Sequence, residues 1–396
     1  MATAIEAITT LLTLAGLAYL LLALMGAREF SHYWRSRQHS TAFAPQVTIL
    51  KPVKGVDPRM YAGLVSHCRQ KYAGSFEIVF GVSALDDPAV AEIKRLQAEF
   101  PSCTIRLVEC RERLGTSGKV SNLVQMLREA RYEHVIINDS DIRVSPLYLT
   151  RVMECFADPN VGMVTVPYIG RTADLRRNDD TPATTVWARL EALGISTDFM
   201  PGVLTARRLE RGIRFGLGST LATTKTVLAK AGGLEPLTEY LADDYEMGAR
   251  IAAAGYRVEL SSEVVETSVP AYAFHGFREH QMRWARSTRD SRRWGYLGLG
   301  ITYALPWAVM TCIASGLALW SFSLLSVVIL ARVAVALSVG VGVLHDDQVL
   351  RDLWLLPLRD FFGLGFWAWS FAGDTVVWRG ELFALRDGRL TKLADR

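Results

Sequence analysis

The chain has 396 residues, of which 50% are hydrophobic and 21% are charged, and its formal net charge is +4. This composition is apolar for a soluble protein. The small net charge, without a lysine- and arginine-rich run interleaved with aromatic residues, argues against a nucleic-acid-binding protein. The cysteines are scattered, with no CxxC pair and no zinc-ligand spacing, so we expect reduced thiols rather than a disulfide framework.

The first long segment of the chain is uncharged from Ala7 to Ala27. A helix of this length rises about 30 Å at about 1.5 Å per residue, which matches the thickness of a bilayer core. A cleaved signal peptide is the alternative, but no basic residue precedes the run and the run is long for such a segment. Because Arg28, Arg35 and Arg37 follow, the positive-inside rule places the N-terminus outside and the next region in the cytoplasm. We expect residues 1–30 to form a transmembrane helix.

Strand-like and helix-like stretches alternate through the next region, residues 45–290, which we expect to be a cytosolic domain. Short apolar runs rich in β-branched residues predict strands, and apolar residues at helical spacing predict helices. Their alternation predicts an α/β fold with a mostly parallel sheet. The predicted strands are Val47–Leu50, Phe76–Val82, Thr104–Val108, the run from Val135 and Val161–Pro167. The predicted helices are Met60–Lys71, Ala89–Phe100, Val120–Arg131 and Glu246–Ala254, and Ile169–Thr184 is predicted to be a loop.

Carboxylates stand where two of these strands end. Asp86 and Asp87 follow the second strand, and Asp139 and Asp141 end the strand that begins at Val135. Ligands of open α/β sheets bind beyond the carboxyl ends of the strands. Because side chains alternate along a strand, Asp139 and Asp141 point the same way. Two such oxygen ligands suit Mg²⁺ or Mn²⁺, which also binds diphosphates, although an Asp-x-Asp pair is also common in solvated turns.

Further polar stretches could serve a phosphate-bearing ligand. Lys119 follows a glycine-rich loop and precedes a predicted helix, so it could contact a phosphate that also binds the N-terminal amides of that helix. The loop is not a P-loop, because it lacks the glycine spacing of that motif. The alternative is that Lys119 is a solvated surface lysine. Gly216–Thr220 permits close backbone approach to a ligand, or is a plain turn. Asp243 and Asp244 stand at the head of a predicted helix, where carboxylates commonly act as caps.

The remainder of the chain is basic and then apolar. His280, Arg283 and Trp284 lie in a basic segment that either balances lipid headgroups or closes over a sugar diphosphate. Residues 297–344 are long enough for a transmembrane hairpin. The apolar segment Leu353–Trp378 contains charges and four tryptophans, which favours an interfacial or re-entrant segment. Within residues 353–396 it is followed by a basic tail, which we expect in the cytoplasm.

The order of these motifs resembles that of an inverting family 2-type glycosyltransferase. The chain is specifically similar to the ceramide glucosyltransferase family and its bacterial relatives associated with hopanoid lipid biosynthesis. The similarity covers nearly the full length, with one departure: His280 stands where the family has Gln or Arg, while Arg283 and Trp284 match. The motifs that carry it are Leu50-Lys51-Pro52, Asp86-Asp87-Pro88-Ala89, Asp139-Ser140-Asp141, Lys119-Val120-Ser121-Asn122, Ala242-Asp243-Asp244-Tyr245, His280-Gln281-Met282-Arg283-Trp284 and Val377-Trp378-Arg379-Gly380.

The resemblance implies a nucleotide-sugar-binding GT-A-type domain over residues 45–290 and roles for several of these motifs. Asp244 would be the catalytic base, and Mg²⁺ or Mn²⁺ would be bound by Asp141 and Asp139. Such a metal stabilises a departing diphosphate, and a single base without a covalent sugar intermediate gives inversion. Asp86 or Asp87 would bind the uridine. The residues expected to bind substrate are Asp86, Asp87, Lys119, Asp139, Asp243, His280, Arg283 and Trp284.

The expected protein is an integral membrane enzyme of the bacterial inner membrane, with its catalytic domain facing the cytoplasm. It would move one hexose from a UDP-sugar to a lipid hydroxyl, with ceramide as the acceptor. One alternative is a hopanoid-lipid N-acetylglucosaminyl- or glucosyltransferase. A processive polysaccharide synthase would require more membrane helices to conduct a polymer than the sequence contains. The last alternative is a membrane protein that only binds nucleotide sugars.

Overall fold

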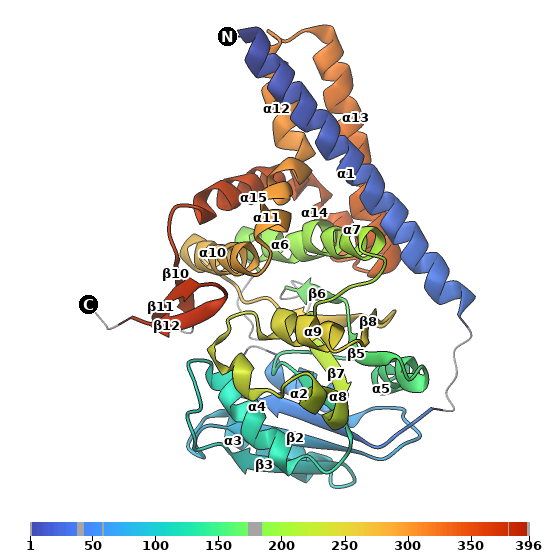
Figure 1. Ribbon diagram of the computed structural model, residues 1–396, viewed down its shortest axis with the longest axis vertical. Helices are drawn as coiled ribbons and strands as arrows, with labels where there is room; N and C mark the ends of the chain where they lie inside the picture. Colours follow the sequence, from blue (N-terminus) through green and yellow to red (C-terminus); the bar gives the residue numbers. More distant parts are fainter. Residues whose placement is uncertain (1, 38–42, 58, 173–183, 379, 394–396) are drawn as a thin grey trace.

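The computed structural model describes residues 2–37, 43–57, 59–172, 184–378 and 380–393. Figure 1 shows three layers along the long axis of the molecule. A sheet domain lies at one end, a group of long helices at the other, and a layer of shorter helices lies between them. The candidate functional residues are distributed over the sheet domain and this middle layer.

The main sheet has seven strands in the order β3-β2-β1-β4-β7-β5-β8. Only β7 runs antiparallel to its neighbours, β4 and β5, and the other pairs are parallel, which confirms the predicted α/β fold. Consecutive residues of β1, β4 and β5 are buried, as expected for strands covered on both faces. The strands are β1 Val47–Pro52, β2 Phe76–Val82, β3 Thr104–Glu109, β4 His134–Asn138, β5 Val161–Thr165, β7 Thr220–Thr224 and β8 Arg257–Leu260. The helices of this domain are α2 Met60–Cys68, α3 Ala89–Glu99, α4 Gly118–Glu129, α5 Tyr148–Met153, α8 Lys225–Lys230 and α9 Asp243–Ala253, with short 3₁₀ helices at Glu154–Ala157 and Glu235–Glu239.

The register of the central strands brings several chain segments to one edge of the sheet. Leu50 of β1 pairs with Val79 of β2 and with Ile137 of β4, so the loops after these three parallel strands leave at the same edge. Strand β7 is antiparallel and contributes its beginning there, because Thr220 pairs with Asn138. The residues that follow β1, β2 and β4 and those that precede β7 therefore meet.

A second, two-stranded sheet corrects the loop predicted from Ile169. Residues Tyr168–Arg171 form strand β6, which pairs in parallel with β9, Val265–Ser268. The partner strand is about a hundred residues away in the chain, so no local pattern indicates the pairing. The rest of the predicted loop, 173–183, lies outside the described residues.

The middle layer consists of helices that cross between the sheet domain and the long helices (Figure 1). Helix α6 continues through a π-helical turn, Ile195–Phe199, into α7, and α10 packs between α6 and α15. The helices of this layer are α6 Val186–Gly194, α7 Met200–Leu209, α10 Phe274–Ser291, α11 Arg293–Thr302, α14 Gln348–Asp352 and α15 Leu356–Ser370, with a 3₁₀ turn at Leu353–Leu355.

Among the described residues, two helices are long and apolar enough to cross a membrane, Thr3–Ser36 and Leu319–Val343. The first lies in α1, Ala2–Ser36, and the second joins α13, Leu319–Val335, to a π-helical extension, Ala336–Val343. A third candidate span is the pair of helices α11 and α12, if the two are counted as one span. Helix α12 comprises Ala304–Ala314, and the two helices are bent by 53° relative to each other. Large apolar side chains of this group face outward, for example Leu11 and Leu330 at 68% and 70% exposure. This is a membrane protein.

The last described residues form a small antiparallel sheet that docks on the sheet domain. The apolar segment Leu353–Trp378 is not one helix, because α15 ends at Ser370 and β10 begins at Thr375. A core of Val376, Phe383, Leu385 and Leu390 packs on Leu241. The strands are β10 Thr375–Trp378, β11 Glu381–Arg386 and β12 Arg389–Lys392, and we refer to them as the C-terminal sheet.

Candidate active site

A half-buried lysine joins two acidic motifs that are a hundred residues apart in the chain. Lys119, in the first turn of α4, places its Nζ 2.9 Å from Asp139 Oδ1 and 3.2 Å from Asp243 Oδ2. Burial alone lowers the pKa of Lys119, but the charges of Asp139 and Asp243 outweigh it and hold the pKa above its ordinary value. The lysine is therefore a fixed positive charge between the end of β4 and the head of α9, not a solvated side chain.

Asp244 lies on the other side of this cluster, beside a glycine. A Cβ atom built on Gly218 would lie 3.1 Å from Asp244 Oδ2 and 3.9 Å from Asp139 Oδ2, so the Gly216–Thr220 stretch passes close to both carboxylates. Asp244 Oδ1 accepts a hydrogen bond from the amide of Tyr245 at 2.8 Å. Burial, and next the charge of Asp243, raises the pKa of Asp244 to about 6, with Lys119 opposing the rise. Such a carboxylate is ionised at neutral pH and close to the pKa at which it accepts a proton well.

Three carboxylates concentrate negative charge at this edge of the sheet: Asp139 and Asp141 follow β4, and Asp57 follows β1. Thr267 donates a hydrogen bond to Asp141 Oδ2, and Ser140 donates one of 3.4 Å to Asp57 Oδ2. Burial raises the pKa of Asp141, and Asp139 and Asp57 raise it further. The described residues contain no group of three or more His, Cys, Asp or Glu arranged as metal ligands. One or two carboxylates with the oxygens of a diphosphate are, however, the usual ligands of Mg²⁺, and Asp139 with Asp141 fits that requirement.

Lys51 supports this edge of the sheet from below. It is completely buried, and its Nζ donates to Asn138 Oδ1 and to the carbonyl of Asp139, the latter at 2.8 Å. Asn138 Nδ2 in turn donates to the carbonyl of Ser219 at 2.7 Å. Burial lowers the pKa of Lys51 to about 7, against the charges of Asp141 and Asp139. In the sequence, Lys51 is visible as a charged residue within an apolar strand. Its partners, Asn138 and Asp139, could not be predicted because the contacts join segments that are far apart in the chain.

The two aspartates after β2 have different surroundings. Asp87 accepts hydrogen bonds from the amides of Gly55 and Ala89, both at 2.9 Å. It therefore holds the loop after β1 against the start of α3, and Gly55 adopts a left-handed φ of 69° there. Asp86 is exposed to solvent. Of this pair, the side chain that remains open to a ligand is that of Asp86.

The basic motif lies on α10, in the middle layer. His280 Nδ1 lies 2.8 Å from Glu191 Oε2, and its ring packs on Trp284 with a centroid distance of 4.6 Å. Arg283 is half-buried. Burial raises the pKa of Tyr272. The negative charges of Glu191 and Asp141 raise this pKa further, and the positive charge of Arg283 lowers it. The ring of Tyr272 lies beside that of His280, with a centroid distance of 5.8 Å.

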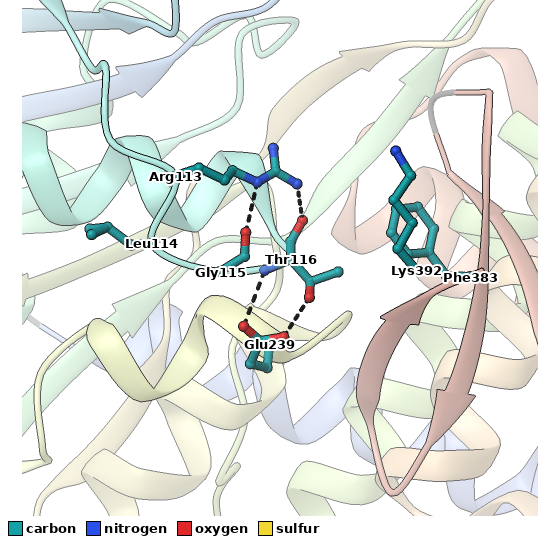
Figure 2. Close-up of a pocket in the computed structure, with 7 residues that line it drawn as sticks. All are labelled: Arg113, Leu114, Gly115, Thr116, Glu239, Phe383 and Lys392. Carbon is teal, nitrogen blue, oxygen red and sulfur yellow. Dashed lines mark hydrogen bonds between the residues drawn. The ribbon is translucent and has the colours of Figure 1, made fainter. Parts of the chain in front are cut away.

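A surface cavity of about 430 Å³ lies beside the cluster, between the loop before α4 and the C-terminal sheet (Figure 2). Glu239 accepts a hydrogen bond from the amide of Thr116 at 3.2 Å and another from its hydroxyl. Arg113 donates to the carbonyl of Gly115 at 2.7 Å. These contacts fix the backbone that leads into Lys119. The lining residues are Arg113, Leu114, Gly115, Thr116, Glu239, Phe383 and Lys392.

Comparison with known proteins gives a consistent result. The model of glycosyl transferase family 21 matches residues 8–391. Ceramide glucosyltransferase 3 of Caenorhabditis elegans is 25% identical in a match that covers 70% of this chain and 59% of the relative. Ceramide glucosyltransferase of Gibberella zeae is 28% identical in a match that covers 41% of this chain and 34% of the relative. The chain thus spans three-fifths or less of these relatives. The mannosyltransferase PcManGT from Pyrobaculum calidifontis, solved in complex with GDP-Man and Mn²⁺, shares the fold with a TM-score of 0.52 and 20% identity, over 93% of this chain and 98% of that one. The chain belongs to glycosyl transferase family 21.

Proposed function

We propose that this glycosyltransferase moves one hexose from a UDP-sugar to a hydroxyl of a membrane lipid, with inversion at the anomeric carbon, and that ceramide is the acceptor. The observation that carries the proposal is the Asp244 carboxylate, with its pKa of about 6, beside the Lys119-bridged pair of Asp139 and Asp243. The names of the curated relatives support the lipid acceptor. The apolar helices Thr3–Ser36 and Leu319–Val343 support access from a membrane.

In this proposal the donor diphosphate binds at the carboxyl ends of β1, β2 and β4. Asp86 contacts the uridine, and Asp139 and Asp141 would hold Mg²⁺ or Mn²⁺ against the diphosphate; the solved relative with GDP-Man and Mn²⁺ supports a divalent cation. Such a cation supplies positive charge that stabilises the departing diphosphate. Lys119 adds a fixed positive charge at the same place. Asp243 holds Lys119 there from the opposite side.

Asp244 acts as the general base. The lipid hydroxyl attacks the anomeric carbon, its proton passes to Asp244 Oδ2, and the bond to the diphosphate breaks with its electron pair leaving on UDP. Because there is a single displacement and no covalent sugar intermediate, the configuration inverts, as in the geometric logic of inverting glycosidases. Gly218 leaves room above the carboxylate, since a Cβ there would lie 3.1 Å from Asp244 Oδ2.

We further propose how the chain is arranged about the bilayer. Residues 1–30 cross it once and 297–344 cross as a hairpin, which leaves 45–290 and the tail after 353 in the cytoplasm of a bacterial cell, at its inner membrane. The exposed apolar side chains of the middle layer would lie at the headgroup level, as Trp354 at 65% and Trp369 at 48% exposure suggest. The acceptor then slides from the leaflet past α10, where His280, Arg283 and Trp284 contact substrate.

Transfer by the purified protein tests this function. The full chain in lipid nanodiscs is incubated with labelled UDP-glucose or UDP-N-acetylglucosamine, with ceramide or a hopanoid polyol as acceptor, and extracted with organic solvent. We expect one organic-soluble glycolipid with ceramide. Label confined to a water-soluble polymer, or only to free sugar, contradicts the proposal, and a product formed only with the polyol identifies the hopanoid alternative.

The matched variants are Asp244→Asn and Asp387→Asn. The first is nearly isosteric and should lower transfer by about 10²–10⁴-fold, as expected for loss of a general base, while UDP binding persists. The second removes a carboxylate that is 82% exposed in an ion pair with Arg293, and it should leave transfer unchanged. Transfer by Asp244→Asn above about a tenth of the wild-type rate would assign the base elsewhere.

A further inference from the structure

A carboxylate–imidazole pair, Glu191 and His280, lies in the middle layer, and Glu191 has no role in the steps described above. Glu191 of α6 is buried at 2% exposure, and its Oε2 lies 2.8 Å from His280 Nδ1 of α10. The same oxygen accepts a weaker hydrogen bond of 3.4 Å from Gln281 Nε2. A buried carboxylate is costly unless it is hydrogen-bonded, so Glu191 holds the His280 ring in a fixed orientation.

The neighbouring charged groups do not require Glu191. Arg359 donates to Asp198 at 2.7 Å and to Gln281 at 2.8 Å, and Arg332 donates to Asp198 and Asp360. Two arginines are thus matched by two aspartates in this cluster. Glu191 is an additional negative charge whose close partner is the imidazole of His280.

The orientation of the ring exposes its second nitrogen. Nδ1 is taken by Glu191, and no hydrogen bond joins Nε2 to the part of the chain that the structure describes. The side chain keeps 19% of its surface accessible, while one face packs on Trp284. Fixing one imidazole nitrogen by a carboxylate determines what the other presents to a ligand. A hydroxyl suits either ring state, because it donates to a bare Nε2 and accepts from a protonated one.

The pair lies between Asp244 and the membrane helices. Burial raises the pKa of Tyr168, the charge of Asp244 raises it further, and then that of Glu191. Strand β6, which carries Tyr168, packs against α6, which carries Glu191. Helices α6 and α10, which carry the pair, lie on the side of the sheet domain that faces α12 and α13 (Figure 1). A lipid that reaches Asp244 from the bilayer passes this position, whereas the diphosphate of the donor lies at Lys119.

We propose that His280 Nε2 forms a hydrogen bond with a second hydroxyl on the headgroup of the lipid acceptor, next to the hydroxyl that reacts, and that Glu191 is the positioning residue that aims it. This inference rests on the function proposed above. It assigns Glu191 a role in acceptor recognition and gives His280 a contact with the acceptor rather than with the donor.

Kinetics with two acceptors test the contact. The full-length protein in detergent micelles is assayed with a short-chain ceramide and with its 3-deoxy analogue, which lacks the neighbouring hydroxyl. We expect His280→Leu to raise the KM for ceramide about tenfold, as for loss of one hydrogen bond, with kcat, the KM for UDP-sugar and the Kd for UDP unchanged. With the 3-deoxy analogue the variant and wild type should have the same KM. His280→Gln, whose amide both donates and accepts, should recover most of the affinity.

Two further variants separate positioning from general structure. Glu191→Leu should raise the KM for ceramide. The double variant Glu191→Leu/His280→Leu should have the same KM as His280→Leu alone, because Glu191 acts through the His280 ring. If Glu191→Leu does not fold, Glu191→Gln, whose amide oxygen can still accept a hydrogen bond from Nδ1, is the milder change. His275→Leu is the control, since His275 forms a comparable pair with Glu279 at 3.4 Å on the same helix but is 67% exposed. It should have no effect.

The outcomes are distinguishable from failure of the proposed function. If wild type transfers no hexose to lipid, the function fails and this inference with it. If wild type is active but His280→Leu leaves the ceramide KM unchanged, raises the KM for UDP-sugar instead, or has the same effect with the 3-deoxy acceptor, only the inference is wrong. Additive effects of the two leucine variants would show that Glu191 does not act through His280.

Discussion

At the scale of single residues, the raised pKa of Asp244 makes a prediction about pH. Burial and the charge of Asp243 bring that pKa to about 6 from an ordinary value of 3.8. A general base works only when ionised, so kcat/KM should fall about tenfold per pH unit below about pH 6 and be flat above it. Rates measured between pH 5 and 8 at constant ionic strength check this. A profile that is flat down to pH 5 would contradict the assignment.

The sign of the linked stability separates this loss of rate from unfolding. A carboxyl whose pKa is raised in the folded state stabilises the fold below its unfolded value of 3.8, and this contribution is lost as the pH rises through about 6. At this group, acidification from pH 7 to 5 therefore favours the folded state. The melting temperature measured in parallel should not fall because of Asp244 while the rate does.

The paired carboxylates of Asp139 and Asp141 predict dependence on a divalent cation. They are two carboxylates in a partly desolvated position, where burial already raises the pKa of Asp141. Excess EDTA should abolish transfer, and Mg²⁺ or Mn²⁺ should restore it. By titration calorimetry, Asp141→Ala should weaken UDP binding in the presence of the metal and leave it unchanged in EDTA. Full activity in excess EDTA would exclude a metal from the reaction.

Lys51 is the residue whose removal should affect both stability and donor binding. Its Nζ satisfies Asn138 Oδ1 and the carbonyl of Asp139 inside the sheet. Lys51→Met leaves these buried acceptors unpaired, at a cost of about 1–3 kcal/mol in the free energy of unfolding, and lets the end of β4 shift. We expect a lower melting temperature and weaker UDP binding. Lys54→Met, at an exposed position three residues later, should change neither.

At the scale of elements, the C-terminal sheet is predicted to hold the loop that leads to Asp243 and Asp244 at the start of α9. The amide of Leu241 donates to the carbonyl of Gly388 at 3.0 Å, and Leu241 packs in the same core as Phe383. Phe383→Ala removes a fully buried ring, which costs about 3–5 kcal/mol and should undock the sheet from the residues before Asp243. Limited proteolysis should then cut the C-terminal sheet, and transfer should fall. Leu382→Ala, on the same strand but 42% exposed, is the control and should do neither.

Elements that local patterns determine were predicted well, and those that depend on distant partners were not. The run Phe76–Val82 is a strand with the predicted bounds, because a buried parallel strand is apolar throughout. Strand β6 was missed because its partner β9 is far away in the chain. The Asp139, Asp243 and Asp244 motifs were proposed from their positions at strand and helix ends, and the structure brings them together around Lys119 and Gly218. Lys119 needed the resemblance as well, and Glu191 could not be found because its significance lies entirely in its contact with His280.

At the scale of the whole molecule, the contacts of the C-terminal sheet determine a topology. Arg389 of β12 forms a β-bridge with Tyr240, which lies three residues before Asp243, the first residue of α9. The C-terminal sheet therefore lies on the same side of the membrane as the sheet domain, and the chain between them must cross the bilayer an even number of times. In the proposed arrangement, the bent pair α11–α12 and helix α13 would supply two crossings as a hairpin, and α1 would supply a single one. The start of α1 is remote from the sheet domain (Figure 1).

We therefore predict that a reporter joined after β12 is cytoplasmic and that one joined before α1 is external. Fusions to a fluorescent protein and to alkaline phosphatase read the two sides, because the first folds in the cytoplasm and the second is active only outside it. The control is a fusion within the sheet domain, in the loop after α8, which should report the same side as β12. If the reporters after β12 and before α1 lie on the same side, α1 does not cross the membrane. If those after β12 and after α8 lie on opposite sides, the contact between Arg389 and Tyr240 cannot form, and α15 would have to be a further span.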